Sequence, residues 1–393
     1  MTNNKKLKVG IVGLGNIGRH HLSYLPDMDR VELVAVCDSV TERADEYAAK
    51  LGAVAYYSPD DMFAKSDLEA VIVAVPHYDH VTIAIEAFRR GIHVLCEKPL
   101  AVHVNDAKKV IAAYEAAKEQ HPQLVFGMMF NERTFPFHRK IKEIVAGGEL
   151  GQLVRATWIN TKWFRTQAYY DSGSWRATWS GEGGGILTNQ CPHNLDMYQW
   201  LFGLPERISG HAHIGKYHDI EVEDEVTAYF EHENGMVGHF IVTTAESPGT
   251  NRLEIVGEHG KLVYEDGKLT LHKNTVSMLQ FSRETTEAWG HMETEVSEVA
   301  VDTTVPSGHA VVTAEFVKAA LDGSELIAHG KEGINSVILA NGIMLSSFIG
   351  QTIDVPFDYD AYQRELEERI RTSKFVKAPV QQVKSDIEGS FSK

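Results

Sequence analysis

The chain has few cysteines, no paired metal-ligand motif and no excess of basic charge. Its three cysteines, Cys37, Cys96 and Cys191, lie far apart without a C-x-x-C pair, which argues against a disulfide framework or a cysteine zinc site and fits a reducing cytoplasm. The 19 histidines form no H-E-x-x-H or H-x-x-x-H pair, so we expect no metal centre. A formal charge of −16 would repel a polyanion, which argues against a nucleic-acid partner.

Long apolar segments are also missing. The N-terminus leads directly into a strand-like segment without an apolar signal region. We find no window of about 18 uncharged apolar residues, and therefore expect no membrane span and a cytoplasmic protein. The length of 393 residues is sufficient for two domains and a large core.

Short apolar runs alternate with helical patterns through the first 130 residues. Repeated strand–helix units of this length are typical of a doubly wound parallel sheet in an α/β protein. The expected strands are Leu7–Val12, Val31–Cys37, Ala55–Tyr57, Val71–Val75, 92–96 and Leu124–Met128.

The first strand leads into a glycine-rich turn, Gly13-Leu14-Gly15-Asn16-Ile17-Gly18, and the second strand ends at Asp38. Strand, G-x-G-x-x-G, helix, strand and acid form the dinucleotide-binding fingerprint. Gly13 permits the tight turn, Gly15 lets the backbone approach a pyrophosphate, and Gly18 allows close packing of the helix on the strand. Asp38 would accept the ribose hydroxyls and repel a 2′-phosphate. We therefore favour NAD as the cofactor and keep NADP as the alternative.

Two further strand ends lie on the same expected rim of the sheet. Pro76, His77 and His80 follow one strand, and Glu97-Lys98-Pro99 follows the next. His80 has a second interpretation as a surface histidine at a helix start, and Glu97-Lys98 as a solvated surface pair. The residues that we expect to contact the cofactor are Gly13, Gly15, Asn16, Ile17, Gly18, Asp38, Val75, Pro76, His77, His80, Glu97 and Lys98.

A segment rich in aromatic residues and arginines lies in the second part of the chain. Aromatic faces suit the C–H faces of a carbohydrate, although a loop packed on the sheet would have the same composition. The residues that we expect to bind substrate are Lys98, Arg165, Tyr169, Trp175, Arg176, Asn189 and His193.

His193 is a candidate for acid–base catalysis. It lies in or just ahead of the first turn of a helix that begins near Pro192. The spacing of Asn189, His193 and Asp196 predicts that all three share one helical face. A histidine with polar neighbours beside a glycine-rich turn is a credible general base, although a lone helix histidine is more often structural.

The combination of these motifs resembles the Gfo/Idh/MocA oxidoreductases, named for glucose–fructose oxidoreductase and inositol dehydrogenase. The motifs are Gly13–Gly18, Glu97-Lys98-Pro99, and Gly183-Gly184-Gly185 followed by the His193 helix. The resemblance extends over residues 8–356. It implies a Rossmann domain that binds NAD(P) and a C-terminal α/β domain with an open, mainly antiparallel sheet that often forms the oligomer interface, so we expect a homo-oligomer, either a dimer or a tetramer.

The resemblance also implies roles for two catalytic residues. Lys98 would contact the substrate and the nicotinamide ribose, and His193 would take the hydroxyl proton. Many members carry Asp four residues before this histidine, where this chain has Asn189. Three explanations stay open: Asp196 supplies the carboxylate, the histidine works with a lower pKa, or the substrate class differs.

We expect residues 1–130 to bind NAD(P), residues 131–358 to bind substrate and form the oligomer, and residues 359–393 to form a helix and a polar, mobile tail. The expected function is hydride transfer between a secondary alcohol of a sugar, polyol or glycoside and the nicotinamide cofactor. Two alternatives are an NAD-dependent glycosidase that acts by transient oxidation and a non-enzymatic NAD-sensing regulator.

Overall fold

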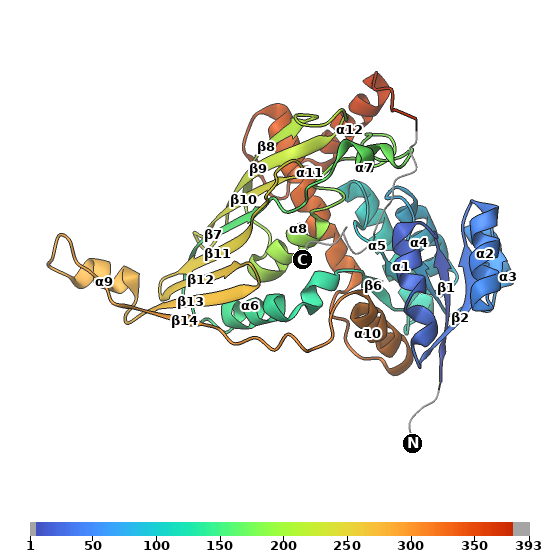
Figure 1. Ribbon diagram of the computed structural model, residues 1–393, viewed down its shortest axis with the longest axis horizontal. Helices are drawn as coiled ribbons and strands as arrows, with labels where there is room; N and C mark the ends of the chain where they lie inside the picture. The colour runs from blue at the N-terminus through green and yellow to red at the C-terminus, as the bar shows by residue number, and fades with distance from the viewer. Residues whose placement is uncertain (1–4, 380–393) are drawn as a thin grey trace.

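A computed structural model describes residues 5–379 and contains two sheets (Figure 1). The first sheet is parallel throughout, with strand order β3-β2-β1-β4-β5-β6. Its strands are β1 (Leu7–Val12), β2 (Val31–Cys37), β3 (Val54–Tyr56), β4 (Ala70–Val73), β5 (His93–Cys96) and β6 (Phe126–Met128). The connecting helices are α1 (Asn16–Leu22), α2 (Thr41–Leu51), α3 (Pro59–Lys65), α4 (Asp79–Arg89) and α5 (Val104–Gln120).

This arrangement confirms the predicted doubly wound sheet. The strand order reverses between β1 and β4, so a crevice forms at their carboxyl ends, where such sheets bind their ligands. The glycine-rich turn follows β1, and His77 follows β4, on either side of this crevice.

The second sheet has nine strands in the order β14-β13-β12-β11-β7-β10-β9-β8-β15. Within the described residues every neighbouring pair is antiparallel except β7 and β10, which confirms the expected mainly antiparallel sheet. Its strands are β7 (Leu153–Asn160), β8 (Arg207–Ile214), β9 (Glu223–Glu231), β10 (Val237–Thr243), β11 (Asn251–Gly257), β12 (Gly260–Glu265), β13 (Lys268–Asn274), β14 (Thr294–Glu298) and β15 (Ile353–Asp354).

Helices fill the space between the two sheets (Figure 1). Helices α6 (Pro136–Ala146), α8 (Pro192–Phe202) and α11 (Gly333–Ile349) lie on the face of the nine-stranded sheet that turns toward the first sheet. Short α7 (Gln167–Asp171) precedes α8, and α9 (Met278–Glu284) projects from the end of the sheet near β14. The buried face of α11 contributes Leu339, Ile343 and Leu345 to the same core as Trp158 of β7.

Helix α11 and the turn before it form an apolar segment. By length and composition alone, Gly330–Ile349 could cross a membrane. In the structure 67% of its apolar window is buried, and the helix packs against α8 and β8. Asn and Ser side chains interrupt the apolar run, so the segment is not a window of uncharged apolar residues alone.

The chain returns to the first sheet after it has formed the second. Helix α10 (His309–Asp322) packs against β1 and β5, and its Val312, Phe316 and Val317 share a core with Leu7 and Ile11. The boundaries at 130 and 358 therefore stay a proposal, since one late helix completes the first unit.

Helix α8 corrects one prediction from the sequence. It begins at Pro192, as expected, with His193 in its first turn, but Asn189 lies in the turn that precedes the helix. The expectation that Asn189, His193 and Asp196 share one helical face is therefore wrong. Pro192 allows a helix start and the three glycines at 183–185 favour an irregular approach, so the helical spacing could not extend back to Asn189.

The C-terminal segment is partly anchored. Helix α12 (Tyr359–Thr372) is followed by an extended segment in which Lys377 donates hydrogen bonds to the carbonyl oxygens of Tyr170 (2.6 Å) and Arg176 (2.7 Å). Lys377 is therefore held by the rest of the fold, in contrast to the mobile tail that we expected after the helix. Residues 380–393 lie outside the described residues.

Candidate active site

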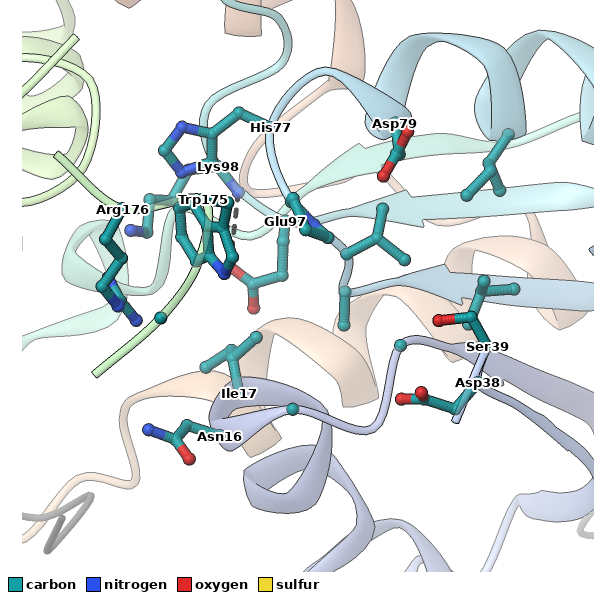
Figure 2. A pocket seen from close by; sticks show the side chains of 18 of the residues that line it. Asn16, Ile17, Asp38, Ser39, His77, Asp79, Glu97, Lys98, Trp175 and Arg176 are labelled. Carbon is teal, nitrogen blue, oxygen red and sulfur yellow. Dashed lines mark hydrogen bonds between the residues drawn. The ribbon is translucent and has the colours of Figure 1, made fainter. Parts of the chain in front are cut away.

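A cavity of about 1020 Å³ lies between the two sheets. Figure 2 shows its central part, where Trp175 and Arg176 lie beside His77 and Lys98, at the opposite end from Asp38 and Ser39. Ten of the expected cofactor-binding residues line the cavity: Gly13, Gly15, Asn16, Ile17, Asp38, Val75, Pro76, His77, Glu97 and Lys98. All of the expected substrate-binding residues also line it: Lys98, Arg165, Tyr169, Trp175, Arg176, Asn189 and His193. Gly18 and His80 lie outside the lining.

The glycine-rich turn has the geometry that its sequence predicts. Gly13 has φ +94°, and a Cβ atom there would lie 2.2 Å from the carbonyl oxygen of Ala74. A Cβ atom on Gly18 would lie 1.9 Å from the carbonyl oxygen of Gly13, so this glycine permits close packing of α1 without facing the cavity. A Cβ atom on Gly15 would meet nothing within 4 Å. The backbone at Gly15 is therefore accessible to a phosphate group of a bound dinucleotide.

Asp38 holds the turn as well as facing the cavity. Its carboxylate accepts hydrogen bonds from the backbone N–H groups of Leu14 (2.8 Å) and Val40 (2.9 Å). Arg43, which is 40% exposed, lies 3.1 Å from the same carboxylate. The residues of this end therefore fit a dinucleotide: an open glycine turn lies beside a carboxylate that is fixed by the backbone.

The two histidines after β4 have different positions. His77 faces Trp175 at 5.5 Å between ring centroids, and its Nδ1 lies 3.0 Å from the carbonyl oxygen of Glu182. His80 is 1% exposed, and its ring nitrogens lie 2.7 Å and 2.9 Å from the carbonyl oxygens of Pro99 and Val75. The surface interpretation of His80 is therefore wrong. Its position ties two strand ends together behind the cavity.

Glu97 and Lys98 are not a solvated surface pair. Glu97 is 3% exposed, and His21 lies 2.8 Å from its carboxylate. Although burial opposes ionisation, the His21 contact and neighbouring positive charges hold the pKa of Glu97 down at about 2. Lys98 Nζ donates to the carbonyl oxygen of Asn189 (2.8 Å), and burial lowers the pKa of Lys98 while the charge of Glu97 opposes this shift.

His193 is 9% exposed, and its buried Nδ1 has no hydrogen-bond partner among residues 5–379. Burial lowers the pKa of His193 well below its usual value, and the charge of Lys98 adds to this effect. The imidazole is therefore neutral near pH 7 and able to accept a proton.

The carboxylate that the sequence seemed to lack near Asn189 comes from Glu182. The Asn189 side chain donates hydrogen bonds to Glu182 and, at 3.3 Å, to Tyr169. Asp196 instead forms two hydrogen bonds with Arg133, at 2.8 Å and 2.6 Å, and accepts a third from Gln199. Asp196 is thus neutralised within the core and does not supply the carboxylate for His193, so a lowered pKa of His193 and a different substrate class stay open as explanations.

Tyr169 is central to the aromatic and arginine segment. The guanidinium groups of Arg165 and Arg176 lie 5.2 Å and 4.6 Å from its ring centroid, and that of Arg176 lies 4.5 Å from the Trp175 ring. Arg176 also donates a hydrogen bond to the Tyr169 hydroxyl at 2.7 Å. The cavity lining is therefore an ordered cation–aromatic cluster on this side.

Sequence reasoning missed several residues of the site. His21 and His309 gather around Glu97, with the His309 ring 5.9 Å from that of His21, and Glu182 underlies Asn189. His21 lies three positions after Gly18, on the helix that the fingerprint predicts, so its direction could have been anticipated. His309 comes from a distant helix and gives no local signal.

A parallel sheet with an open glycine turn, combined with a second sheet across a shared cavity, defines the two-domain dinucleotide-binding proteins. Comparison with known proteins narrows this class. Residues 7–126 match the model of an oxidoreductase family with an NAD-binding Rossmann fold, GFO/IDH/MocA, and residues 138–263 match the model of the C-terminal domain of the same family. The chain belongs to this family, which confirms the resemblance inferred from the motifs.

Curated relatives match part of the chain. Inositol 2-dehydrogenase of Leifsonia xyli is 28% identical over 206 residues, which are 52% of this chain and 56% of the relative. Inositol 2-dehydrogenase of Salmonella paratyphi B is 36% identical over 151 residues, or 37% and 43% of the two chains. The match thus spans about half the length of these relatives.

Solved structures match over nearly the whole fold. The WlbA dehydrogenase from Chromobacterium violaceum, in complex with NADH and UDP-GlcNAcA, has a TM-score of 0.76 and 25% identity, and the match covers 91% of this chain and 98% of that one. Levoglucosan dehydrogenase, in complex with NADH, has a TM-score of 0.74 at 20% identity, covering 90% and 100% of the two chains, and supports the fold alone.

Proposed function

We propose that this protein transfers a hydride between a secondary alcohol of a sugar or polyol and NAD. The observation that carries the proposal is the shared cavity. The open turn at Gly15, Lys98 and His193 all line it. Relatives named inositol 2-dehydrogenase and a solved relative with bound NADH agree with this activity.

The residues fit a cofactor that accepts or donates hydride at the nicotinamide ring. The turn at Gly13, Gly15, Asn16 and Ile17 would hold the pyrophosphate, and Asp38 would accept the ribose hydroxyls. The carbonyl oxygen of Ala74 occupies the space that a side chain on Gly13 would need, so the turn requires glycine at this position.

His193 would take the proton of the substrate hydroxyl. Its imidazole lines the cavity, and its lowered pKa keeps it neutral near pH 7. Lys98 would donate a hydrogen bond to the same oxygen and stabilise its developing negative charge. Glu97 does not compete for this amine through its side chain, because His21 binds the carboxylate.

A screen of inositols, aldoses, anhydrosugars and glycosides for NAD reduction, followed by NADH absorbance, tests the proposal. We expect NADH to accumulate with at least one class. Net hydrolysis of a glycoside without NADH accumulation would instead identify the NAD-dependent glycosidase. Retained NAD binding without turnover on any substrate would identify the regulator.

We further propose that copies of the chain associate through the nine-stranded sheet and that the protein works in the cytoplasm. Sedimentation velocity of the purified chain tests the first part. A sedimentation coefficient that corresponds to 43.8 kDa at every concentration would contradict association.

A further inference from the structure

The sugar end of the cavity carries positive charge that proton transfer does not require. The lining residues after position 150 include the guanidinium groups of Arg165 and Arg176 and, within the described part of the chain, no carboxylate. Lys98 adds a third cation at the centre. The lining carboxylates of Asp38, Asp60, Asp79 and Glu86 all come from the first sheet and its helices, and Glu97 lies at the centre with His21 against it.

The carboxylate of Glu182 lies near this positive charge but does not line the cavity. Glu182 is 2% exposed, and it accepts hydrogen bonds from the backbone N–H of Ala177 (2.6 Å) and from the Asn189 side chain. It lies 3.9 Å from Arg176, which is beyond hydrogen-bonding distance. Burial raises the pKa of Glu182, and the charge of Arg176 opposes this shift.

The structure holds Arg176 in place from three sides. Ala177, the next residue, has φ +60°, a conformation that residues other than glycine rarely adopt. The N–H of Ala177 is bound by Glu182, and the carbonyl oxygen of Arg176 accepts a hydrogen bond from Lys377 at 2.7 Å. The guanidinium stacks on Tyr169 and Trp175. Backbone in a rare conformation that several contacts fix is found most often at ligand sites.

We propose that the substrate is a sugar or polyol with an anionic substituent, a carboxylate or a phosphate, that binds Arg176 and Arg165. A stacked guanidinium keeps its N–H groups in a fixed plane, which suits the oxygens of either anion. This inference rests on the proposed function, since it assigns the substrate class of the same site.

Matched ligands test the inference by binding, independently of turnover. D-glucose, D-galactose and D-mannose are compared with their uronates and their 6-phosphates by calorimetric titration into the NADH-loaded protein. We expect the anion of at least one series to bind at least tenfold more tightly than the neutral sugar. Preference for the uronate or the 6-phosphate then identifies the anion.

Variants assign the preference to the arginines. Arg176→Gln should reduce the anion preference to about threefold or less, and Arg176→Lys should retain an intermediate part of it. Arg371→Gln is the matched control, because Arg371 is 71% exposed and pairs only with Glu368 of its own helix among the described contacts. If Arg176→Gln does not fold, Arg165→Gln and titrations of the unaltered protein at 0.05 and about 0.5 M salt replace it, since screening should weaken anion binding alone.

Equal or tighter binding of the neutral sugar in every series would overturn the inference, as would an anion preference that Arg176→Gln and Arg165→Gln leave unchanged. Failure of the proposed function is distinguishable from these results. Anion binding that depends on Arg176 without NADH formation from any sugar would contradict the dehydrogenase and leave this inference standing. NADH formation from neutral sugars alone, at the same rate with Arg176→Gln, would do the reverse.

Discussion

The cavity wall from the first sheet and the wall from residues 163–193 differ in how their side chains are held. On the first wall, Gly13, Gly15 and Asp38 belong to one strand–turn–helix–strand unit, and the contact between Leu14 and Asp38 closes it locally. On the second wall, Arg176 depends on Glu182, which is six residues further along the chain, and on Lys377, which is 201 residues away.

This difference predicts which binding affinity a substitution on each wall should change. The first wall should govern the affinity for the dinucleotide, and the second should govern the affinity for the sugar. Lys98 lies where the walls meet, because it follows β5 and its amine donates to the carbonyl oxygen of Asn189 across the cavity. Substitutions on each wall can break or sharpen this division.

The largest effect is expected at the junction of the walls. Lys98→Ala should reduce kcat by about 10³- to 10⁴-fold, because it removes the donor that stabilises the substrate oxygen. NADH affinity, measured by fluorescence titration, should change by less than about threefold if most of the dinucleotide contacts lie elsewhere on the first wall. A kcat of Lys98→Ala close to that of the unaltered protein would contradict the proposed mechanism.

His193→Asn should reduce kcat by about 10²-fold. We expect a smaller effect than at Lys98 because Asp196, the carboxylate three residues after His193, is bound by Arg133. The pH profile of kcat/KM distinguishes the two roles of His193: its substitution should change the acid limb of the profile if His193 is the proton acceptor, but not if it is structural.

The sign of this profile follows from the lowered pKa of His193 and of Lys98. Activity should fall on acidification only below pH 6.5, where His193 becomes protonated. As pH rises, activity should begin to fall at a pH lower than 10.5, because the lowered pKa of Lys98 lets the amine lose its proton earlier. The acid limb should disappear in His193→Asn, and its persistence would assign it to another group.

Asp38→Asn should act on the first wall alone. Loss of the negative charge should weaken NAD binding by about tenfold, as expected for a charged hydrogen bond, and should reduce the discrimination against NADP. Values of kcat/KM with each cofactor measure both effects. An equal or greater change in the KM of the sugar would show that the two walls are not separable.

Lys377→Met should have the smallest effect, on the second wall. Loss of two hydrogen bonds to the segment that carries Arg176 should raise the KM of the sugar by about three- to tenfold, while the KM of NAD stays constant. Lys374→Met is the matched control, since Lys374 is exposed in the same segment. Equal KM values for both variants would remove Lys377 from the site.

The sequence predicted the first wall almost completely. Alternation of apolar strands and helices indicated the parallel sheet, and the spacing of Gly13, Gly15, Gly18 and Asp38 indicated the turn. Local sequence suffices there because each contact joins residues within about one strand–helix–strand unit. His80 is the exception, since its ring contacts the carbonyl oxygen of Pro99, which follows the next strand, β5.

The second wall was predicted as a set of residues but not as an arrangement. Helical spacing placed Asn189 on the face of His193, whereas the glycines before Pro192 break that periodicity. Asp196 looked available for His193 because its partner, Arg133, lies 63 residues away. Periodicity describes neighbours along a helix and carries no information on which distant charge neutralises a carboxylate.

By itself, the sequence determined the two-sheet fold, the family and the candidate residues, because strand patterns, turn glycines and short motifs are local properties. Only the tertiary structure decided how those residues are used. It paired Glu97 with His21 and Asp196 with Arg133, placed Glu182 under Asn189, and fixed Arg176 through Lys377. Charge compensation in a buried site depends on separations in space, which the order of residues along the chain does not specify.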